Sequence, residues 1–131
     1  SAQHVSGLDR GVYRYSPIVD KLVPVVGPEG CLGVRNALAG EPAIEQSDAA
    51  GVQLIFVISP WRSMRKYGPR GLRFAFQEAG AIAQQINLIC TALGLASVES
   101  SSFYEDELNE ALKLDGIFET ATHTMTVGVQ A

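Results

Sequence analysis

The chain has 131 residues, a length typical of one domain, and its apolar and charged fractions of 47% and 18% suit a globular protein with its own core. Its formal net charge of −4 argues against a general nucleic-acid binder. There is no signal peptide and no apolar run of the length that crosses a bilayer, so the sequence predicts a cytoplasmic protein without membrane contact.

The first third of the chain predicts a strand pair followed by short helical segments. Alternation bounded by Gly and Ser-Pro predicts a strand over 11–15, and 21–25 is expected to pair with it across a turn at 16–20. The spacing over 31–38 is compatible with a short helix, and a further helical turn is expected within 41–50.

The strongest patterns lie in the middle and at the end of the chain. Continuous apolar residues over 52–59 predict a strand covered on both faces. Residues 71–93 predict a long helix that is apolar nearly all round, and therefore buried in the core or in a subunit interface. The remaining expected elements are a strand over 96–99, a helix over 105–114 and a strand over 120–129. This mixed order of strands and helices indicates an α+β fold.

A basic segment separates the central strand from the long helix. It runs from Trp61 to Phe74, and we expect a short loop there. The segment carries four arginines and one lysine, namely Arg62, Arg65, Lys66, Arg70 and Arg73. A packed core has no use for this much charge, so these side chains need anionic partners or open water. Taken by themselves, the residues favour a solvated Lys66 and a Tyr67 that merely packs.

The cysteines and histidines do not predict a metal site. Cys31 and Cys90 lie far apart without a second ligand nearby, so two buried reduced thiols are expected, and nothing supports a disulfide. His4 and His123 have no metal-ligand spacing. The alternating strand that carries His123 predicts a surface or interface position for this residue.

Four ordered motifs span nearly the whole chain. They are Gly11-Val12-Tyr13-Arg14-Tyr15-Ser16-Pro17; Arg62-x-x-x-Lys66-Tyr67-Gly68-x-Arg70-Gly71-x-Arg73-Phe74; Glu78-Ala79-Gly80 with Ala83-Gln84-Gln85-Ile86-Asn87-Leu88; and Leu112-x-Leu114-Asp115-Gly116-x-x-Glu119. Each motif alone is weak, but the ordered set is specific. It resembles the azoline-dehydrogenase branch of the flavin nitroreductase superfamily, whose members oxidise thiazoline and oxazoline rings during maturation of peptide natural products.

The resemblance implies a nitroreductase-like fold with a mixed, mostly antiparallel sheet and a long buried central helix. It also implies an FMN-dependent dehydrogenase that forms an obligate dimer, binds flavin at the subunit interface and commonly works beside a cyclodehydratase. The family's Lys-Tyr pair falls on Lys66 and Tyr67, which are therefore the candidate catalytic residues. Arg62, Arg70 and Arg73 are candidates for substrate binding or for structural ion pairs, and ion pairs are favoured for the last two.

Lys66 and Tyr67 suit the chemistry that this resemblance implies. Aromatising an azoline removes a carbon-bound proton and a hydride, and the flavin accepts the hydride. The protein must supply a base near the carbon and a hydrogen-bond donor for the ring heteroatom or carbonyl. Which of the two residues is the base stays open.

Two departures from the family pattern concern the cofactor. In many relatives a Pro and one or two Gly bring the backbone close to the flavin, and the stretch 97–102 lacks them. Ser hydroxyls and backbone amides can still contact the flavin edge, so Glu99, Ser100 and Ser101 are the candidate flavin contacts, with a plain strand-to-helix connection as an equal alternative. The N-terminal helix that holds the FMN phosphate in relatives has no counterpart here. We therefore expect residues 1–131 to form a single domain that is the C-terminal portion of the fold. Its own N-terminal portion or a companion chain would complete it, in a homodimer or a heteromer.

Three functions follow from these observations. The first is oxidation of azoline-containing peptides by an FMN-dependent enzyme. The second is an NAD(P)H-dependent, nitroreductase-like activity on small electrophiles. The third is a non-catalytic interaction subunit that kept the fold and lost the flavin.

Overall fold

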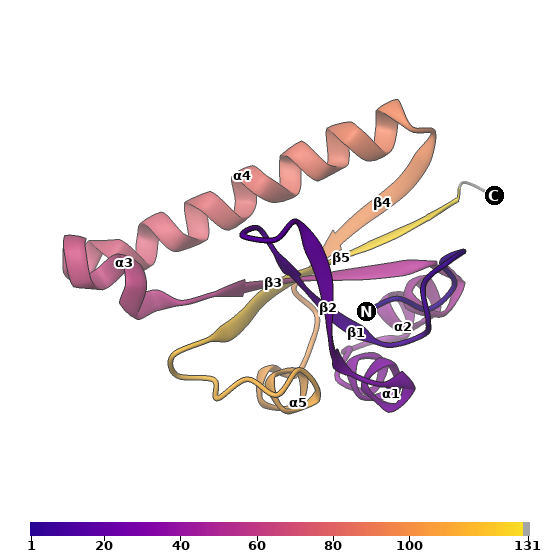
Figure 1. Ribbon diagram of the computed structural model, residues 1–131, viewed down its shortest axis with the longest axis horizontal. Helices are drawn as coiled ribbons and strands as arrows, with labels where there is room; N and C mark the ends of the chain where they lie inside the picture. The colour runs from indigo at the N-terminus through magenta and orange to yellow at the C-terminus, as the bar shows by residue number, and fades with distance from the viewer. Residues whose placement is uncertain (130–131) are drawn as a thin grey trace.

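Two antiparallel sheets form the framework of the protein in the computed structural model, which describes residues 1–129 (Figure 1). A two-stranded ribbon consists of β1 (Val12–Ser16) and β2 (Lys21–Val26). A three-stranded sheet has the order β3 (Val52–Ile58), β5 (Thr120–Val129) and β4 (Leu95–Ser100). Its central strand β5 is the last in the chain and pairs antiparallel with both neighbours.

Helices flank the three-stranded sheet on both sides. Figure 1 shows α4 (Arg70–Ala92) on one side and the other helices of the core on the opposite side. These are α1 (Pro28–Asn36), α2 (Glu41–Ala49) and α5 (Glu105–Ala111). The main apolar cluster joins α1, α5, β1 and β5 and comprises Val12, Val34, Ala37, Leu108, Leu112 and Ala121. The α+β architecture with a long helix, predicted from the sequence, is confirmed.

The predicted elements differ from the observed ones mainly at helix ends. Helix α1 begins at Pro28 and not at residue 31, because proline suits the first helical position, where no backbone donor is needed. Helix α5 ends at Ala111, short of the predicted residue 114, because Lys113 has a φ of 59°, in the left-handed region that stops a helix. Helix α2 lies within the predicted range 41–50.

The basic segment is mostly helical, so its prediction as a loop is wrong. Helix α3 (Pro60–Tyr67) begins at Pro60, and Gly68, with a φ of 61°, turns the chain into α4. Arginine, methionine and lysine are good helix formers, and a helix this short is stabilised chiefly by packing against its neighbour. That packing is close at Gly71, where a Cβ atom would collide with the backbone of Ser63 and Met64.

Helix α4 is long, as predicted. Of the two predicted kinds of burial, in the core or in a subunit interface, the single chain provides the first on one face of the helix only. Its buried residues are all small, namely Gly71, Ala79, Ala83 and Cys90. The large side chains of Leu88, Ile89 and Leu93 are 57%, 55% and 68% exposed. The helix therefore packs on the sheet through small residues, and its large apolar side chains are exposed on the opposite face.

Strand β3 is also less covered than predicted. Gln53 and Ile58 are buried, whereas Val57 is 39% exposed. The strand lies at an edge of the three-stranded sheet, and an edge strand has fewer neighbours to cover it than a central one.

Replacement of Gly71 by Ala is expected to destabilise the protein by about 1–3 kcal/mol, because the new Cβ would collide with the backbone of α3. Gly80→Ala is the matched control on the same helix, since outside the neighbouring backbone of α4 no atom lies within 4 Å of its Cβ position. Alanine should raise helix propensity there by up to about 1 kcal/mol. Thermal and urea unfolding of both variants measures the difference, and equal stability would contradict the close α3–α4 contact.

Candidate functional site

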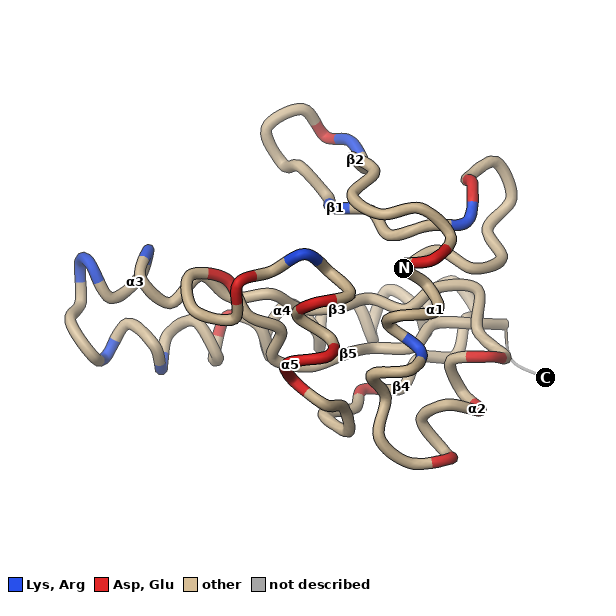
Figure 2. The backbone as a smooth tube through the Cα atoms, turned by 90° about the horizontal axis from the view of Figure 1, so that it is seen from below, with Lys and Arg blue, Asp and Glu red and all other residues tan. Residues whose placement is uncertain are grey.

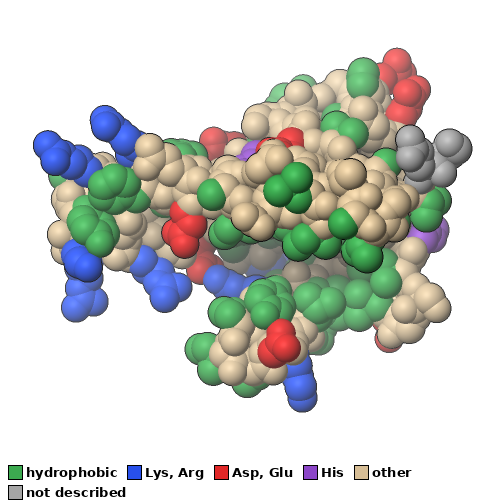
Figure 3. Space-filling model, turned by 90° about the horizontal axis from the view of Figure 1, so that it is seen from above, with side chains coloured by type: hydrophobic (Ala, Val, Ile, Leu, Met, Phe, Trp, Pro, Cys, Tyr) green, Lys and Arg blue, Asp and Glu red, His purple; other side chains and the backbone are tan. Residues whose placement is uncertain are grey.

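Basic side chains gather at one end of the molecule, on α3 and the first turns of α4 (Figures 2 and 3). They belong to Arg62, Arg65, Lys66, Arg70 and Arg73. The ion pairs within residues 1–129 are Arg14–Glu119, Arg35–Asp48 and a long His123–Glu99 contact. The predicted ion pairs of Arg70 and Arg73 are therefore wrong within the described chain. Helices α3 and α4 have no acidic residue before Glu78, so this end keeps an uncompensated positive charge.

The predicted catalytic pair lies on an exposed corner at the end of α3. The amine of Lys66 is 5.0 Å from the centroid of the Tyr67 ring. The Tyr67 ring meets Phe74 of α4 edge-on, with centroids 5.2 Å apart and an interplanar angle of 89°. Tyr67 is 48% exposed, so its hydroxyl and the amine of Lys66 are accessible from outside. The contact with Phe74 fixes the ring against α4 while leaving both polar groups available.

The predicted cofactor residues line a second feature, a pocket of about 380 Å³ beside α4. Its walls come from α4, the end of β4 and the middle of β5. The lining residues are Phe76, Gly80, Glu99, Ser100, Ser101, Thr122 and His123. The structure thus brings the cofactor candidates together with parts of α4 and β5 that the sequence did not associate with them.

The pocket and the Lys66–Tyr67 pair both border helix α4 but are separate. Phe76 and Gly80 lie about 8 to 14 Å beyond Gly71 at a rise of about 1.5 Å per helical residue. Neither Lys66 nor Tyr67 is among the residues that line the pocket. Within one chain, the catalytic and cofactor candidates therefore form two neighbouring sites.

A hydrogen-bond network holds Glu99 in the pocket wall. Asn87 of α4 donates from Nδ2 to Oε1 of Glu99 at 2.5 Å. The hydroxyl of Ser97 donates to Oδ1 of the same asparagine at 2.6 Å. Sequence reasoning missed the role of Asn87, which is one of several polar residues on this helix and carries no distinguishing spacing.

His123 lies in the pocket wall, a position that sequence reasoning also missed. Its ring stacks on Phe56 of β3, with centroids 4.1 Å apart and an interplanar angle of 9°, and its side chain is 15% exposed. Burial lowers the pKa of the imidazole, and the nearby Glu99 carboxylate opposes this shift. The pairing of β3 with β5 sets His123 opposite Phe56, and no local pattern in β5 reveals this partner.

The chemical groups of the pocket suit a flat polar ring better than a phosphate. Phe76 offers an apolar surface, and the serine, threonine, glutamate and histidine side chains offer hydrogen-bonding atoms. A dianionic phosphate needs cations or several free amide donors. No lysine or arginine is among the residues lining this pocket.

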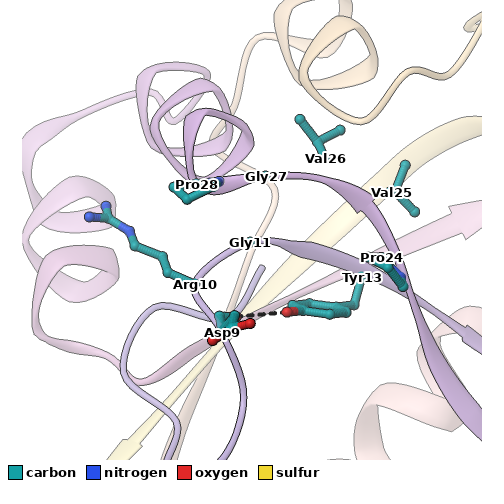
Figure 4. Close-up of a pocket in the computed structure, with 9 residues that line it drawn as sticks. All are labelled: Asp9, Arg10, Gly11, Tyr13, Pro24, Val25, Val26, Gly27 and Pro28. Carbon is teal, nitrogen blue, oxygen red and sulfur yellow. Dashed lines mark hydrogen bonds between the residues drawn. The ribbon is translucent and has the colours of Figure 1, made fainter.

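A larger pocket, of about 580 Å³, lies at the base of the β1–β2 ribbon, away from all these candidates (Figure 4). Asp9, Arg10, Tyr13 and the stretch from Pro24 to Pro28 line most of it. The Tyr13 hydroxyl donates to the carbonyl of Asp9 at 2.8 Å. The polar groups of this pocket are thus partly used in holding the ribbon, and none of the predicted site residues lies there.

Two further findings concern metals and membranes. Within residues 1–129 there is no group of three or more His, Cys, Asp or Glu side chains arranged to hold a metal ion. None of the helices in the same range combines the length and the hydropathy needed to cross a bilayer.

Comparison with known proteins identifies the family. Residues 5–129 match the model of the nitroreductase family. MJ1384 of Methanocaldococcus jannaschii, a protein named as a nitroreductase, is 34% identical over 116 residues, which cover 87% of this chain and 56% of that protein. The chain thus spans about half the length of this curated relative.

Two solved structures show the same fold at low identity. An Anabaena variabilis protein named as a nitroreductase aligns with a TM-score of 0.82 and 23% identity, over 96% of this chain and 25% of that chain. A chain of the E. coli microcin synthetase McbBCD complex with truncated pro-MccB17 bound aligns with a TM-score of 0.76 and 21% identity, over 91% of this chain and 44% of that one. With the family match over almost its full length, this chain belongs to the nitroreductase family.

Proposed function

We propose that this chain is part of an FMN-dependent oxidoreductase that oxidises thiazolines or oxazolines in peptides to the aromatic azoles. The observation that carries the proposal is the Lys66–Tyr67 pair, exposed at the end of α3 and packed through Tyr67 against α4, the helix that also forms one wall of a pocket for a flat ring. Family membership supports flavin-dependent redox chemistry. The structural likeness to a microcin synthetase chain supports a peptide substrate.

The pocket beside α4 fits one part of FMN. Its volume is at the lower end of the range of about 300 to 1,000 Å³ found for small-ligand sites. Ser100, Ser101 and Glu99 would meet the polar edge of the ring, and Phe76 its face. The phosphate would be held by residues outside this pocket, because no cation lines it. When bound, FMN supplies the acceptor for the hydride that the azoline loses.

The side chains of this chain would handle the proton. One member of the Lys66–Tyr67 pair takes the proton from the ring carbon, and the other donates a hydrogen bond to the ring heteroatom or the adjacent carbonyl. Phe74 orients Tyr67 through the edge-on contact. Arg62, Arg70 and Arg73 keep the corner positive, which favours substrates with anionic or electron-rich groups near the azoline.

A second chain would complete the site. The Lys66–Tyr67 pair and the pocket are separate within one chain. For both to act on one ligand, the pair of one chain would have to lie beside the pocket of another. The apolar outer face of α4 offers the surface for this assembly, with Leu88, Ile89 and Leu93 exposed. The partner in this proposal is a second copy, or a companion chain or N-terminal portion of the same fold. A cyclodehydratase is a further proposed partner, since the azoline must be made before it can be oxidised.

An NAD(P)H-dependent activity on small electrophiles is the second candidate. It is favoured by the family match and by the fold of a Staphylococcus epidermidis protein named as an NAD(P)H:FMN oxidoreductase, with a TM-score of 0.61 and 12% identity. Oxidation of NAD(P)H in the presence of a nitroarene, without any oxidation of a peptide azoline, would favour this second function. A protein without flavin absorbance in its complete assembly would instead indicate an interaction subunit.

Lys66→Ala is expected to lower the rate of azoline oxidation at least about 100-fold, the lower end of what general acid–base catalysis contributes. Tyr67→Phe should also lower the rate while keeping the ring contact with Phe74. Lys21→Ala on the exposed end of the ribbon is the control and should be active. Azole formation is followed by mass, since each oxidation removes two hydrogens. Full turnover by Lys66→Ala would exclude the catalytic role of this residue.

Leu88→Asp is expected to weaken self-association at least about tenfold, because a charge replaces an apolar contact worth roughly 1.5–3 kcal/mol. The matched control is Leu32→Asp on α1, where the side chain is 53% exposed and lies away from α4. Sedimentation velocity over a range of protein concentrations measures both. If both variants associate like the unmodified protein, the α4 face is not the interface.

A further inference from the structure

Two large apolar side chains are exposed on the loop between α5 and β5. Ile117 and Phe118 are both more than half exposed. Oδ1 of Asp115 accepts hydrogen bonds from three backbone amides of this loop, those of Ile117 at 2.9 Å, Phe118 at 2.7 Å and Glu119 at 3.1 Å. The amide of Gly116 closes the turn by donating to the carbonyl of Glu119 at 3.0 Å. The loop's own hydrogen bonds therefore hold the two apolar side chains in their exposed position.

The only tryptophan of the chain joins this loop from α3. The ring of Trp61 lies 6.3 Å from the ring of Phe118, at an interplanar angle of 44°, and Trp61 is also more than half exposed. We call Trp61, Phe118 and the neighbouring Ile117 the Trp61 patch. A single exposed apolar residue is ordinary, whereas several large ones joined in one place mark an interaction site. Aromatic residues in particular are enriched at protein interfaces.

Two arginines of α3 border the Trp61 patch. Arg65 lies one helical turn beyond Trp61 on the same face of the helix, and Arg62 precedes Arg65 by three residues. Neither arginine forms an ion pair within residues 1–129. The acids of the nearby loop are already engaged, since Asp115 binds the loop amides and Glu119 pairs with an arginine of β1. Figure 3 shows hydrophobic side chains among the basic ones at this end of the molecule.

The charge of the whole chain directs an anionic partner to this end. Five of the ten basic residues lie within 60–77, a range without any acid, so the other five stand against all fourteen Asp and Glu residues. An acidic partner is therefore repelled over most of the surface and attracted to the α3 end. Such an uneven distribution of charge orients a partner on approach and rejects wrong orientations.

We propose that the Trp61 patch, with Arg62 and Arg65, docks an acidic segment of the peptide substrate in which a large apolar side chain lies next to carboxylates. The apolar side chain would pack against Trp61 and Phe118, and the carboxylates would pair with the two guanidinium groups. Because the loop is held by its own hydrogen bonds, docking costs little ordering of the patch.

The place of the patch relative to Lys66 favours the substrate as the source of this segment. Trp61 and Lys66 belong to the same helix and are about 7 to 8 Å apart along its axis, at a rise of about 1.5 Å per residue. An extended peptide advances about 3.3 Å per residue, so the docked segment lies about two to four residues from the azoline. The identification of the source rests on the proposed oxidation, whereas the docking surface itself does not.

The fluorescence of Trp61 reports binding at the patch directly, since the chain has no other tryptophan. The probe is a short, glycine-spaced peptide with one leucine flanked by glutamates. One control peptide has glutamine in place of glutamate, and the other has serine in place of leucine. The probe should change the fluorescence, and each control should bind at least about fivefold more weakly. Added salt should bring the probe close to the glutamine control. Equal affinity of the probe and either control would overturn the proposal.

Arg65→Gln and Phe118→Ser should each weaken probe binding at least about threefold, through the lost ion pair and the lost apolar contact. Arg10→Gln is the control for charge, since it removes one cation at the base of the ribbon. Ile18→Ser is the control for apolar exposure, since this side chain is 92% exposed in the turn between β1 and β2. Both controls should bind the probe like the unmodified protein. Unchanged binding by Arg65→Gln or by Phe118→Ser would overturn the proposal.

Two variants of Asp115 separate the order of the loop from its charge. Asp115→Ala removes the acceptor of three loop amides, so it should weaken probe binding although it also removes a negative charge. Asp115→Asn keeps an acceptor and removes the same charge, so it should bind the probe at least as well as the unmodified protein. Charge alone would strengthen binding in both variants. Tighter binding by Asp115→Ala would therefore overturn the role of the ordered loop.

Other occupants are outcomes that would overturn the proposal. Vesicles with phosphatidylglycerol, or a single-stranded oligonucleotide, might be expected of a basic and aromatic surface, and tighter binding of either than of the probe would replace the peptide as the occupant. Loss of self-association in Phe118→Ser, measured by sedimentation velocity, would indicate a second copy of the chain instead.

Kinetics test the source of the docked segment separately from the reaction. An azoline peptide that carries the acidic, leucine-containing segment should have a lower KM than one without it, with a similar kcat, because docking stabilises the ground state and the transition state alike. Equal KM values would overturn the substrate as the source. Probe binding needs neither flavin nor turnover, so a protein that binds the probe and oxidises no azoline would contradict the proposed oxidation and not the docking surface.

Discussion

The pairing of β5 with both of its neighbours is the constraint on which the pocket depends. The register sets His123 opposite Phe56, Met125 opposite Glu99 and Thr124 opposite Ser100. An irregularity follows Phe56, where the pairing moves from His123 to Ala121 and passes over Thr122. Such a bulge re-aims side chains locally. It frees the Thr122 hydroxyl to bond to the Phe56 carbonyl, and the same threonine then orients the imidazole.

The two sides of the sheet are built differently, and this difference matters for assembly. On the side of α1 and α5, large aliphatic side chains such as Val34, Leu108 and Leu112 fill the core. On the α4 side, small residues such as Ala79 and Ala83 let the helix lie close to the strands. Close approach through small residues leaves the larger apolar residues of α4 on the outside. A helix that is apolar nearly all round is usually covered on both faces. In the single chain the sheet covers one face of α4, and the opposite apolar face is exposed.

The sequence predicted the elements whose patterns are long and local. The α+β class, α4 and β5 followed from periodicity, and the ordered motifs pointed to the family. Helix α3 was missed because its eight residues carry much charge and little apolar pattern, so contact with Gly71 rather than propensity decides its structure. The sequence predicted burial of α4 without choosing between the core and a subunit interface, because composition cannot tell cover by the same chain from cover by another.

The site could be predicted only where its residues are neighbours in the sequence. Glu99, Ser100 and Ser101 are consecutive, and they do line one pocket. His123 and Asn87 join them through strand register and helix packing, which a single sequence does not reveal. The assignment of Lys66 and Tyr67 rests on resemblance, and their exposed position is compatible with substrate access.

The tight contact at Gly71 has a mechanical consequence. With no room for even a methyl group between the two backbones at Gly71, we expect α3 and the start of α4 to move together. A tilt of α4 would then also move α3, and with it the amine of Lys66 and the hydroxyl of Tyr67. A neighbouring molecule that presses on the far end of this helix would thereby steer the two polar groups without touching them.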